Sequence, residues 1–294
     1  MGAAAALGSA ALWAITNLIL RGQVTKLGGA AANGWRTTFS ALSFSIIFFL
    51  LRQPGDLLTI PMRTLATLLA SMMLSLVLGD ILQFTAIARL GVALAMPISS
   101  CYPIFTLVIA FVVLGEPITV RAVLGAFLVV IGVVLVALPR RPLDEAEQAQ
   151  RRALTKNHWI GVAIARTAAI CAAFSTTLMR VAIKDLDTLV ANMIRLPVSA
   201  VICSAIGTAQ RRALPWRIER WRFGPLLLAG LVSMGSGVLY LNAIKLAGAS
   251  KTATLNASAP IFGLIGAILI LRERPANRNI LGTLVAFAGI ALVV

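Results

Sequence analysis

The sequence predicts an all-α membrane protein of about ten transmembrane helices, arranged as two inverted five-helix repeats around a central cavity. Three observations lead to this prediction. Charged residues make up only 12% of the 294 residues and hydrophobic residues 59%, whereas a soluble domain carries roughly 25% charged residues. Apolar runs long enough to cross a bilayer recur along the whole chain, and the second half of the sequence repeats the first.

The apolar runs define the helices. A helix needs roughly 20 mostly apolar residues to cross a hydrocarbon core of about 30 Å. Charged clusters, Pro and Gly separate such runs. The predicted helices cover 4–20, 33–51, 65–86, 92–114, 119–138, 158–181, 188–208, 223–245, 251–271 and 277–294. The first run lacks the positive segment of a signal peptide, so we expect it to be retained as a helix.

A polar segment at 139–157 divides the chain into a first half, 1–138, and a second half, 158–294. The net charge of +16 would suggest nucleic acid in a soluble protein. Here most Lys and Arg residues lie in short segments between apolar runs, where they meet anionic head groups. We therefore expect membrane lipid, and no nucleic acid, as a partner.

An internal duplication relates the two halves. Pro103-Ile104-Phe105 recurs as Pro260-Ile261-Phe262, 157 residues later, and Glu116, Gly125 and Gly132 recur at the same distance as Glu273, Gly282 and Gly289. Earlier in each half the distance is 159 residues and relates Arg36 to Arg195. A repeat of five helices is odd in number, so the second copy enters the membrane from the opposite side. Inverted repeats are typical of alternating-access transporters, which bind substrate near the midplane between the copies.

These repeated residues resemble the EamA family of the drug/metabolite transporter superfamily. Its marks are an Arg in the second helix, a Pro midway along the fourth, and a Glu before a Gly-rich fifth helix, and both halves carry them in order. The resemblance covers nearly the whole chain and implies a ten-helix basket with a central cavity in the bacterial inner membrane. It also implies export of amino acids or related metabolites. Arg272-Glu273-Arg274-Pro275 departs from the family's pattern, which has an uncharged residue before Glu.

Asp80 is the outstanding polar residue, because it lies within an apolar run. A carboxylate in hydrocarbon costs several kcal/mol unless it is paired, hydrated or protonated. It is a candidate site for a substrate ammonium or for a coupling proton; the alternatives are a carboxylate that reaches the interface and a partner for an Arg. Its counterpart in the second half is Gly237.

Arg36 and Arg195 lie a few residues inside their helices. One interpretation is structural, with a guanidinium that anchors a helix end. The other is a clamp for a substrate carboxylate or phosphate, which the forked donors of Arg suit.

Two prolines at equivalent positions, Pro103 and Pro260, predict kinks that free the backbone groups of residues 99 and 256. In lipid such groups need partners, so these stretches should face a neighbour or a water-filled cavity. The candidate substrate-binding residues that accompany the kinks are Trp13, Asn17, Asp80, Ser99, Ser100, Tyr102, Tyr240, Asn242, Asn256 and Ser258. Each alone is more often a contact between helices than a ligand contact.

The sequence contains no nucleotide-binding loop, zinc spacing or nucleophile elbow. We therefore expect no cofactor, no metal and no catalytic residue, and a small-molecule substrate driven by an ion gradient or by exchange. The alternatives are an exporter of organic cations or drugs and a carrier of phosphorylated metabolites. A non-transporting scaffold is a less favoured alternative.

Glu116 and Glu273 are predicted to be turn and capping residues. The glycines of the fifth and tenth helices are predicted to be packing residues.

Loop charge and the family resemblance predict opposite orientations of the protein in the membrane. The first loop and every second loop after it hold sixteen Lys and Arg residues, and the alternate loops hold seven. The positive-inside rule therefore places both termini outside, whereas the family resemblance implies termini inside. An even number of helices requires only that the two termini share a side.

Overall fold

The computed structural model describes residues 1–51, 60–90, 95, 98–137, 155–184, 186–209, 223–263, 265 and 277–293. Within these residues the regular structure is entirely helical. The elements are α1 Gly2–Leu27, α2 Gly29–Leu51, α3 Met62–Met72, the π-helix η2 Met73–Gly79, α4 Asp80–Leu90, α6 Tyr102–Leu114, α7 Val120–Ala137, α9 Thr155–Ala182, α10 Thr188–Ala209, α11 Phe223–Ala247, α12 Ala249–Asn256 and α14 Asn277–Val293. Glu273 and most of the polar segment 139–157 lie outside the described residues.

Six of these helices are long and apolar enough to cross a membrane: α1, α2, the continuous run Met62–Leu90, α9, α10 and α11. Three shorter apolar helices correspond to the predicted fourth, fifth and tenth helices. They are Tyr102–Leu114, Val120–Leu135 and Ile280–Val293. The described helices thus agree with a multi-helix membrane protein.

The fourth and ninth helices are broken, which corrects the prediction of continuous helices at 92–114 and 251–271. Turns at Ser100-Cys101 and Ala257-Ser258 interrupt them. The backbone bonds of the two breaks correspond: the N–H of Cys101 donates to Ile98 and that of Ser258 donates to Leu255. Each break lies 157 residues from the other and just before a proline, whose ring and missing N–H disfavour an uninterrupted helix.

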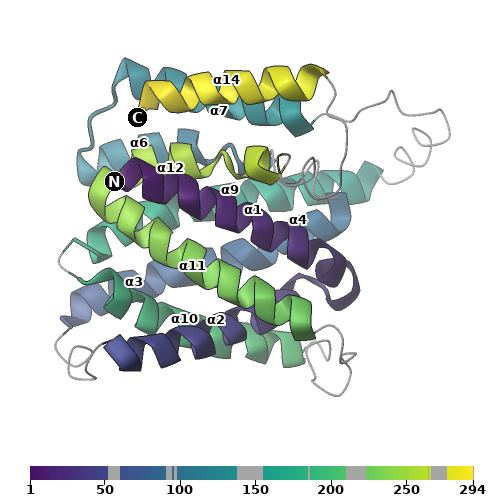
Figure 1. Cartoon of the computed structure of the whole chain (residues 1–294), viewed down its shortest axis with the longest axis vertical. Coiled ribbons are helices and arrows are strands. Elements are labelled where there is room, and N and C mark those ends of the chain that lie inside the picture. Colours follow the sequence, from purple (N-terminus) through teal and green to yellow (C-terminus); the bar gives the residue numbers. More distant parts are fainter. Residues whose placement is uncertain are drawn as a thin grey trace.

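Helices of the two halves pack against one another (Figure 1). α1 lies along α11, α2 along α10 and α7 along α14, while α9 lies along the run of α3, η2 and α4. α7 and α14 approach most closely at glycines. A Cβ added to Gly132 would lie 2.5 Å from the carbonyl oxygen of Gly282, and one added to Gly289 would lie 2.7 Å from that of Gly125. This is the packing role that the sequence predicts for these glycines.

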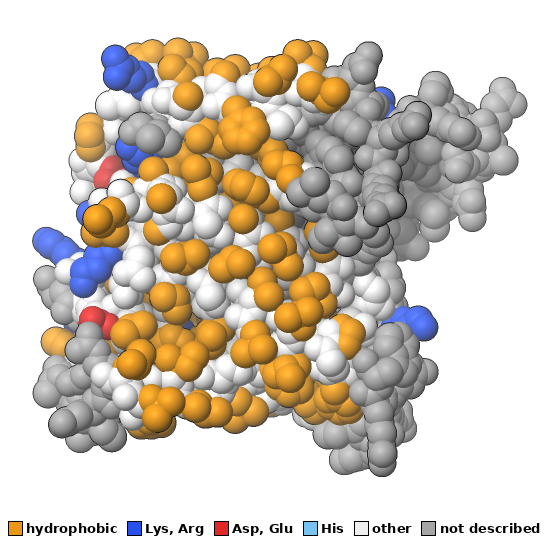
Figure 2. Space-filling view, viewed as in Figure 1, with side chains coloured by type: hydrophobic (Ala, Val, Ile, Leu, Met, Phe, Trp, Pro, Cys, Tyr) orange, Lys and Arg blue, Asp and Glu red, His pale blue; other side chains and the backbone are white. Residues whose placement is uncertain are grey.

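The outer surface is apolar. Hydrophobic side chains are spread over the described part of the face seen in Figure 2, while charged side chains lie at its margins. Leu50, Val112 and Val201 are among the large apolar side chains that are at least 70% exposed, as lipid-facing residues would be. Figure 1 shows the N and C termini at the same end of the helices, which agrees with the even helix count.

Candidate functional site

A cavity of about 200 Å³ lies between the two halves. Elements of both halves contribute to it: α1, α2, the α3–α4 run and the fourth helix from the first half, and α9, α10, α11 and the ninth helix from the second. Nine of the twelve predicted residues line it, namely Trp13, Arg36, Asp80, Ser99, Ser100, Tyr102, Arg195, Tyr240 and Asn256.

Asp80 forms an ion pair with Arg36, whose Nη2 lies 2.5 Å from Asp80 Oδ2. Arg36 also donates from Nε and Nη2 to Asn33 Oδ1, at 3.1 and 2.6 Å. Its guanidinium lies over the Trp13 and Phe84 rings, 5.4 and 5.9 Å from their centroids. Such a cation over aromatic faces is stabilised by the ring quadrupole. The structure therefore supports the interpretation of Asp80 as the partner of an arginine, with 15% of its side chain still accessible.

A π-helix presents Asp80 to the cavity. η2, Met73–Gly79, ends directly before Asp80, and the N–H of Asp80 donates to the carbonyl of Ser75, five residues earlier. Gly79 allows this turn, because an added Cβ would lie 2.7 Å from the carbonyl oxygen of Leu74. π-helical turns inside α-helices are frequent at functional sites. This element was not predicted from the sequence, which contains no clear signal for it.

The second arginine is paired quite differently. Arg195 is only 4% exposed. Its Nη2 donates to Ser75 Oγ at 3.3 Å, and its Nε has no hydrogen-bond partner in the described part of the chain. Neighbouring Asn192, one helical turn earlier, also lines the cavity, and its Nδ2 is likewise unpartnered there. Among the described residues, the cavity thus contains one guanidinium that forms an ion pair with Asp80 and a second that interacts with Asp80 without forming one.

The helix breaks bring Ser99 and Asn256 to the cavity wall, as the equivalent kinks predict. The Ser99 hydroxyl lies within hydrogen-bond reach of two acceptors, Gln83 Oε1 and the carbonyl of Ala95, and its one hydrogen can be donated to either. The side chains of Tyr102 and Asn256 lie close enough to interact with each other, but neither the Tyr102 hydroxyl nor Asn256 Oδ1 forms a well-aligned hydrogen bond among the described residues. Buried polar atoms are nearly always paired, so these two are available to a ligand or to water.

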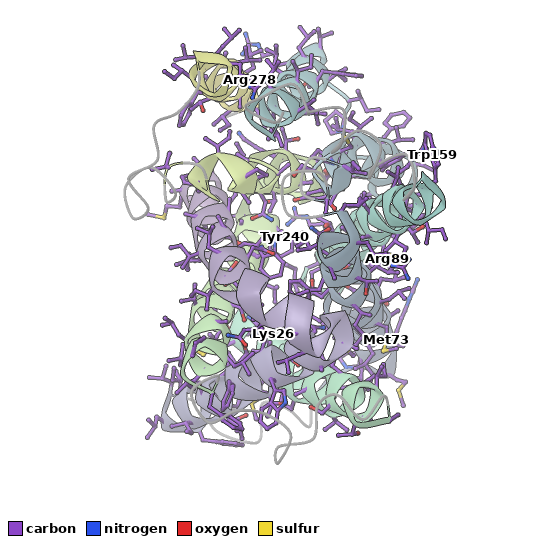
Figure 3. The ribbon with its side chains drawn as sticks, turned by 90° about the vertical axis from the view of Figure 1, so that its right-hand side faces the viewer. Lys26, Met73, Arg89, Trp159, Tyr240 and Arg278 are labelled. Carbon is purple, nitrogen blue, oxygen red and sulfur yellow. The ribbon has the colours of Figure 1, made fainter. Side chains whose placement is uncertain are left out.

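Tyr240 completes the wall on α11, with its hydroxyl 2.6 Å from Thr176 Oγ1 on α9. Figure 3, which looks along the helices, shows Tyr240 near the middle of the molecule, while Trp159 and Arg278 lie at its margin.

Three predicted residues do not line the cavity. Asn17 Nδ2 donates to the carbonyl of Trp13, and Asn242 Nδ2 donates to that of Val238. Ser258 is fully buried and donates to the carbonyl of Leu255. All three donate within their own helix or turn, and Asn242 Oδ1 also accepts from Thr188 Oγ1 of α10 at 3.1 Å. These are the local and interhelical roles that isolated polar residues most often have in membrane helices.

Several lining residues were not predicted. They are Ser9, Ser75, Gln83, Ser175, Thr176, Asn192, Ser233 and Ser236. Asn192 was open to prediction, because Asn33-x-x-Arg36 and Asn192-x-x-Arg195 repeat at the same distance of 159 residues. The Ser and Thr residues carry no such signal, since Ser9 with Ser236 and Ser71 with Ser175 form reciprocal hydroxyl-to-carbonyl bonds that also serve helix packing.

Within the described ranges, no group of three His, Cys, Asp or Glu side chains could hold a metal ion. What the cavity offers is hydrogen-bond donors, acceptors and two guanidinium groups against one carboxylate, which is a binding surface for a small polar molecule.

Comparisons with known proteins agree with a carrier. The sequence profile of the EamA-like transporter family matches residues 1–138 and 159–294. An uncharacterized transporter of Archaeoglobus fulgidus is 28% identical over 98% of this chain and 95% of its own length. A Listeria innocua protein that is named for sugar uptake is 24% identical over 98% of this chain and 94% of its own.

A solved crystal structure matches 97% of this chain and 94% of its own with a TM-score of 0.75 at 15% identity, which shows a shared fold. The profile match extends over nearly the entire sequence. The chain therefore belongs to the EamA-like transporter family and is a multi-pass integral membrane protein.

Proposed function

We propose that this protein is a secondary transporter that exports amino acids, or closely related small metabolites, across the bacterial inner membrane by alternating access. The single observation that carries this proposal is the cavity between the halves, whose wall holds both signs of charge at Arg36, Asp80 and Arg195. A zwitterion offers a partner to each sign.

The size of the cavity supports a small substrate. A cavity of about 150 Å³ is enough for benzene, and drug-sized ligands occupy sites of about 300–1,000 Å³. The volume here, about 200 Å³, suits a single amino acid better than a drug. The described cavity wall carries two guanidinium groups and one carboxylate, and this excess of positive charge disfavours binding of an organic cation.

The duplication supports alternating access. The broken fourth and ninth helices have corresponding backbone bonds and meet the cavity from the two halves. We infer that the copies are inverted and that one half rocks against the other around a fixed site, as in other inverted-repeat carriers.

A monosaccharide is the second candidate substrate. The hydroxyl-rich wall, with Ser99, Tyr102 and Tyr240 beside the Trp13 ring, and the name of the Listeria relative favour it. A neutral sugar would, however, leave Asp80 as the one acidic side chain of the described cavity wall against two buried guanidinium groups.

The test is counterflow in proteoliposomes. Purified protein is reconstituted with a trapped panel of L-amino acids, monosaccharides, an organic cation and a phosphorylated metabolite, and uptake of each labelled compound is measured. We expect accelerated exchange of one or more amino acids. Exchange of monosaccharides alone would select the second candidate, and exchange of none of the four classes would overturn the carrier assignment.

Asp80 is the proposed site of proton coupling, because it is the acidic residue among the described residues of the cavity wall. An imposed pH gradient should then drive uptake in the wild type and not in Asp80→Asn, compared at equal amounts of folded protein. Equal gradient-driven uptake in both would remove Asp80 from the coupling step.

A further inference from the structure

Three cavity residues of the first half have counterparts in the second. Asn33 and Arg36 correspond to Asn192 and Arg195 at a distance of 159 residues, and Asp80 corresponds to Gly237 at 157. The two arginines therefore occupy equivalent places, but among the described residues only the first forms an ion pair with a carboxylate.

In the first half every partner is present. Arg36 donates to Asp80 at 2.5 Å and twice to Asn33 Oδ1. Asn33 Nδ2 donates to the carbonyl of Leu76 at 2.7 Å. Asn33 and Arg36 are at most 2% exposed, so their polar groups are satisfied within the protein.

In the second half, the corresponding pair, Asn192 and Arg195, lacks several of these hydrogen-bond partners among the described residues. Arg195 Nε and Asn192 Nδ2 are buried and unpartnered among the described residues, and Arg195 has a single hydrogen bond, to Ser75. Within that part of the chain the ion pair of Arg36 with Asp80 has no counterpart at Arg195. Arg195 interacts with Asp80 only at longer range than an ion pair. One carboxylate does not fully compensate two buried guanidinium groups, so the arrangement favours binding of an anion.

The space that a carboxylate side chain at position 237 would enter is not filled by described residues. A Cβ added to Gly237 would meet one atom within 4 Å, Asn192 Oδ1 at 3.9 Å. Gly237 lies three residues before Tyr240 and so on the same face of α11, and both residues line the cavity. The absent side chain leaves room on the cavity side of Arg195.

We propose that Arg195, Asn192 and Gly237 form an anion site that binds the carboxylate of the transported substrate, where Asp80 would stand by symmetry. Arg195 donates to the carboxylate from its guanidinium, and Asn192 donates from Nδ2 after its amide turns, because its Oδ1 is the atom nearest to Gly237. Gly237 leaves the space for the carboxylate. One negative charge neutralises Arg195, as Asp80 neutralises Arg36. A phosphate group, with about −1.5 to −2 charges, would exceed what this single guanidinium balances.

This inference rests on the proposed function, since it assigns the group by which the same cavity recognises its substrate. It is tested with acetate as the probe, because a bare carboxylate fits the site whatever the rest of the substrate is. The thermal midpoint of purified wild-type protein is measured in sodium acetate and in sodium chloride at equal ionic strength. We expect acetate to raise the midpoint by a few degrees.

Two substitutions at Gly237 separate charge from bulk. Gly237→Asp should supply the missing carboxylate, raise the midpoint in chloride above that of the isosteric Gly237→Asn, and abolish the acetate effect. A midpoint for Gly237→Asp at or below that of Gly237→Asn, or an equal acetate effect in Gly237→Asp and wild type, would overturn the inference.

Arg195→Gln provides an independent test of the anion site. It removes a buried charge that has no ion-pair partner among the described residues, so this variant should melt no lower than wild type in chloride and should lose the acetate effect. An arginine with a purely structural role would instead lower the midpoint when replaced. Because acetate binding is read from stability and the proposed function from transport, either can fail while the other stands: acetate binding without amino-acid exchange would retain the anion site and reject the substrate assignment.

Discussion

The carboxylate of Glu116 accepts a hydrogen bond from the hydroxyl of Ser250 at 2.6 Å, across 134 residues of sequence. The same carboxylate accepts from the backbone N–H groups of Ala249 and Ser250, at 3.0 and 3.1 Å. A residue that follows α6 in the first half thus caps the first turn of α12 in the second half. The first N–H groups of a helix have no partner within it, and a carboxylate there also favours the helix dipole. This agrees with the capping role that the sequence predicts for Glu116.

Glu116→Ala should destabilise the protein by about 1–2 kcal/mol, since it leaves the N-terminus of α12 without its cap. Ser250→Ala is the matched control, because it removes one of the three bonds and leaves both backbone bonds in place; its effect should be smaller. Thermal midpoints in detergent measure both. A larger loss in Ser250→Ala than in Glu116→Ala would contradict the capping role.

The ion pair of Arg36 and Asp80 predicts a strong coupling between these two residues. Asp80→Asn and Arg36→Gln should each destabilise by about 3 kcal/mol, because each leaves one buried partner uncompensated. The double variant should cost about 1–3 kcal/mol less than the two single variants together. Additive losses in this double-mutant cycle would show that the pair contributes nothing specific to the fold.

Close approach of α7 and α14 predicts that Gly132→Ala is destabilising. An added Cβ would lie 2.5 Å from the Gly282 carbonyl oxygen and 2.6 Å from Ala286 Cβ. Overpacking of this kind costs about 1–3 kcal/mol, which outweighs the roughly 0.5–1 kcal/mol that Ala gains over Gly in a helix. In Gly22→Ala, the matched control in α1, nothing lies within 4 Å of the added Cβ, so that midpoint should stay the same or rise.

The even helix count predicts that both termini lie on one side of the membrane, and Figure 1 shows them at the same end. In a protein without native cysteines, a single cysteine is added before residue 1 or after residue 294. An impermeant thiol reagent applied to intact cells should label both of these proteins or neither. Labelling of one terminus alone would require an odd number of crossings.

Much of the site was predictable because the duplication ties distant residues together. Pro103 and Pro260 locate both helix breaks, and Asp80 is recognisable as a carboxylate in an apolar run. The partner of Asp80 was not predictable, since Arg36 could equally have reached the interface. The π-helix η2 was missed because nothing in Met73–Gly79 distinguishes it from an ordinary apolar helix, although it sets the face on which Asp80 lies.

Asn17 and Asn242 were predicted to line the cavity and do not. Each is a polar side chain in an apolar run, as Asn192 is, but each bonds to the carbonyl four residues earlier on its own helix. Which of these two outcomes an isolated Asn adopts depends on the rotation of its helix, and composition does not determine that rotation.

The last prediction concerns access to the two helix breaks. Ser99 and Asn256 line the same cavity from equivalent positions, while Val108 on α6 is 56% exposed on the outer surface. A charged thiol reagent reaches water-filled cavities and not the hydrocarbon, because a charge in the bilayer core is costly. In a protein without native cysteines, Ser99→Cys and Asn256→Cys should therefore react in proteoliposomes and Val108→Cys should not.

If one half rocks against the other, Ser99→Cys and Asn256→Cys should each become reactive from either side of the membrane as the cavity opens alternately. Saturating substrate, once the counterflow panel has identified it, should slow both reactions by about tenfold or more, because it occupies the volume that the reagent must enter. Protection of one position alone would place the substrate in one half only. Equal reactivity at residues 99, 256 and 108, with no protection at any of them, would show that the helix breaks do not open to a substrate cavity.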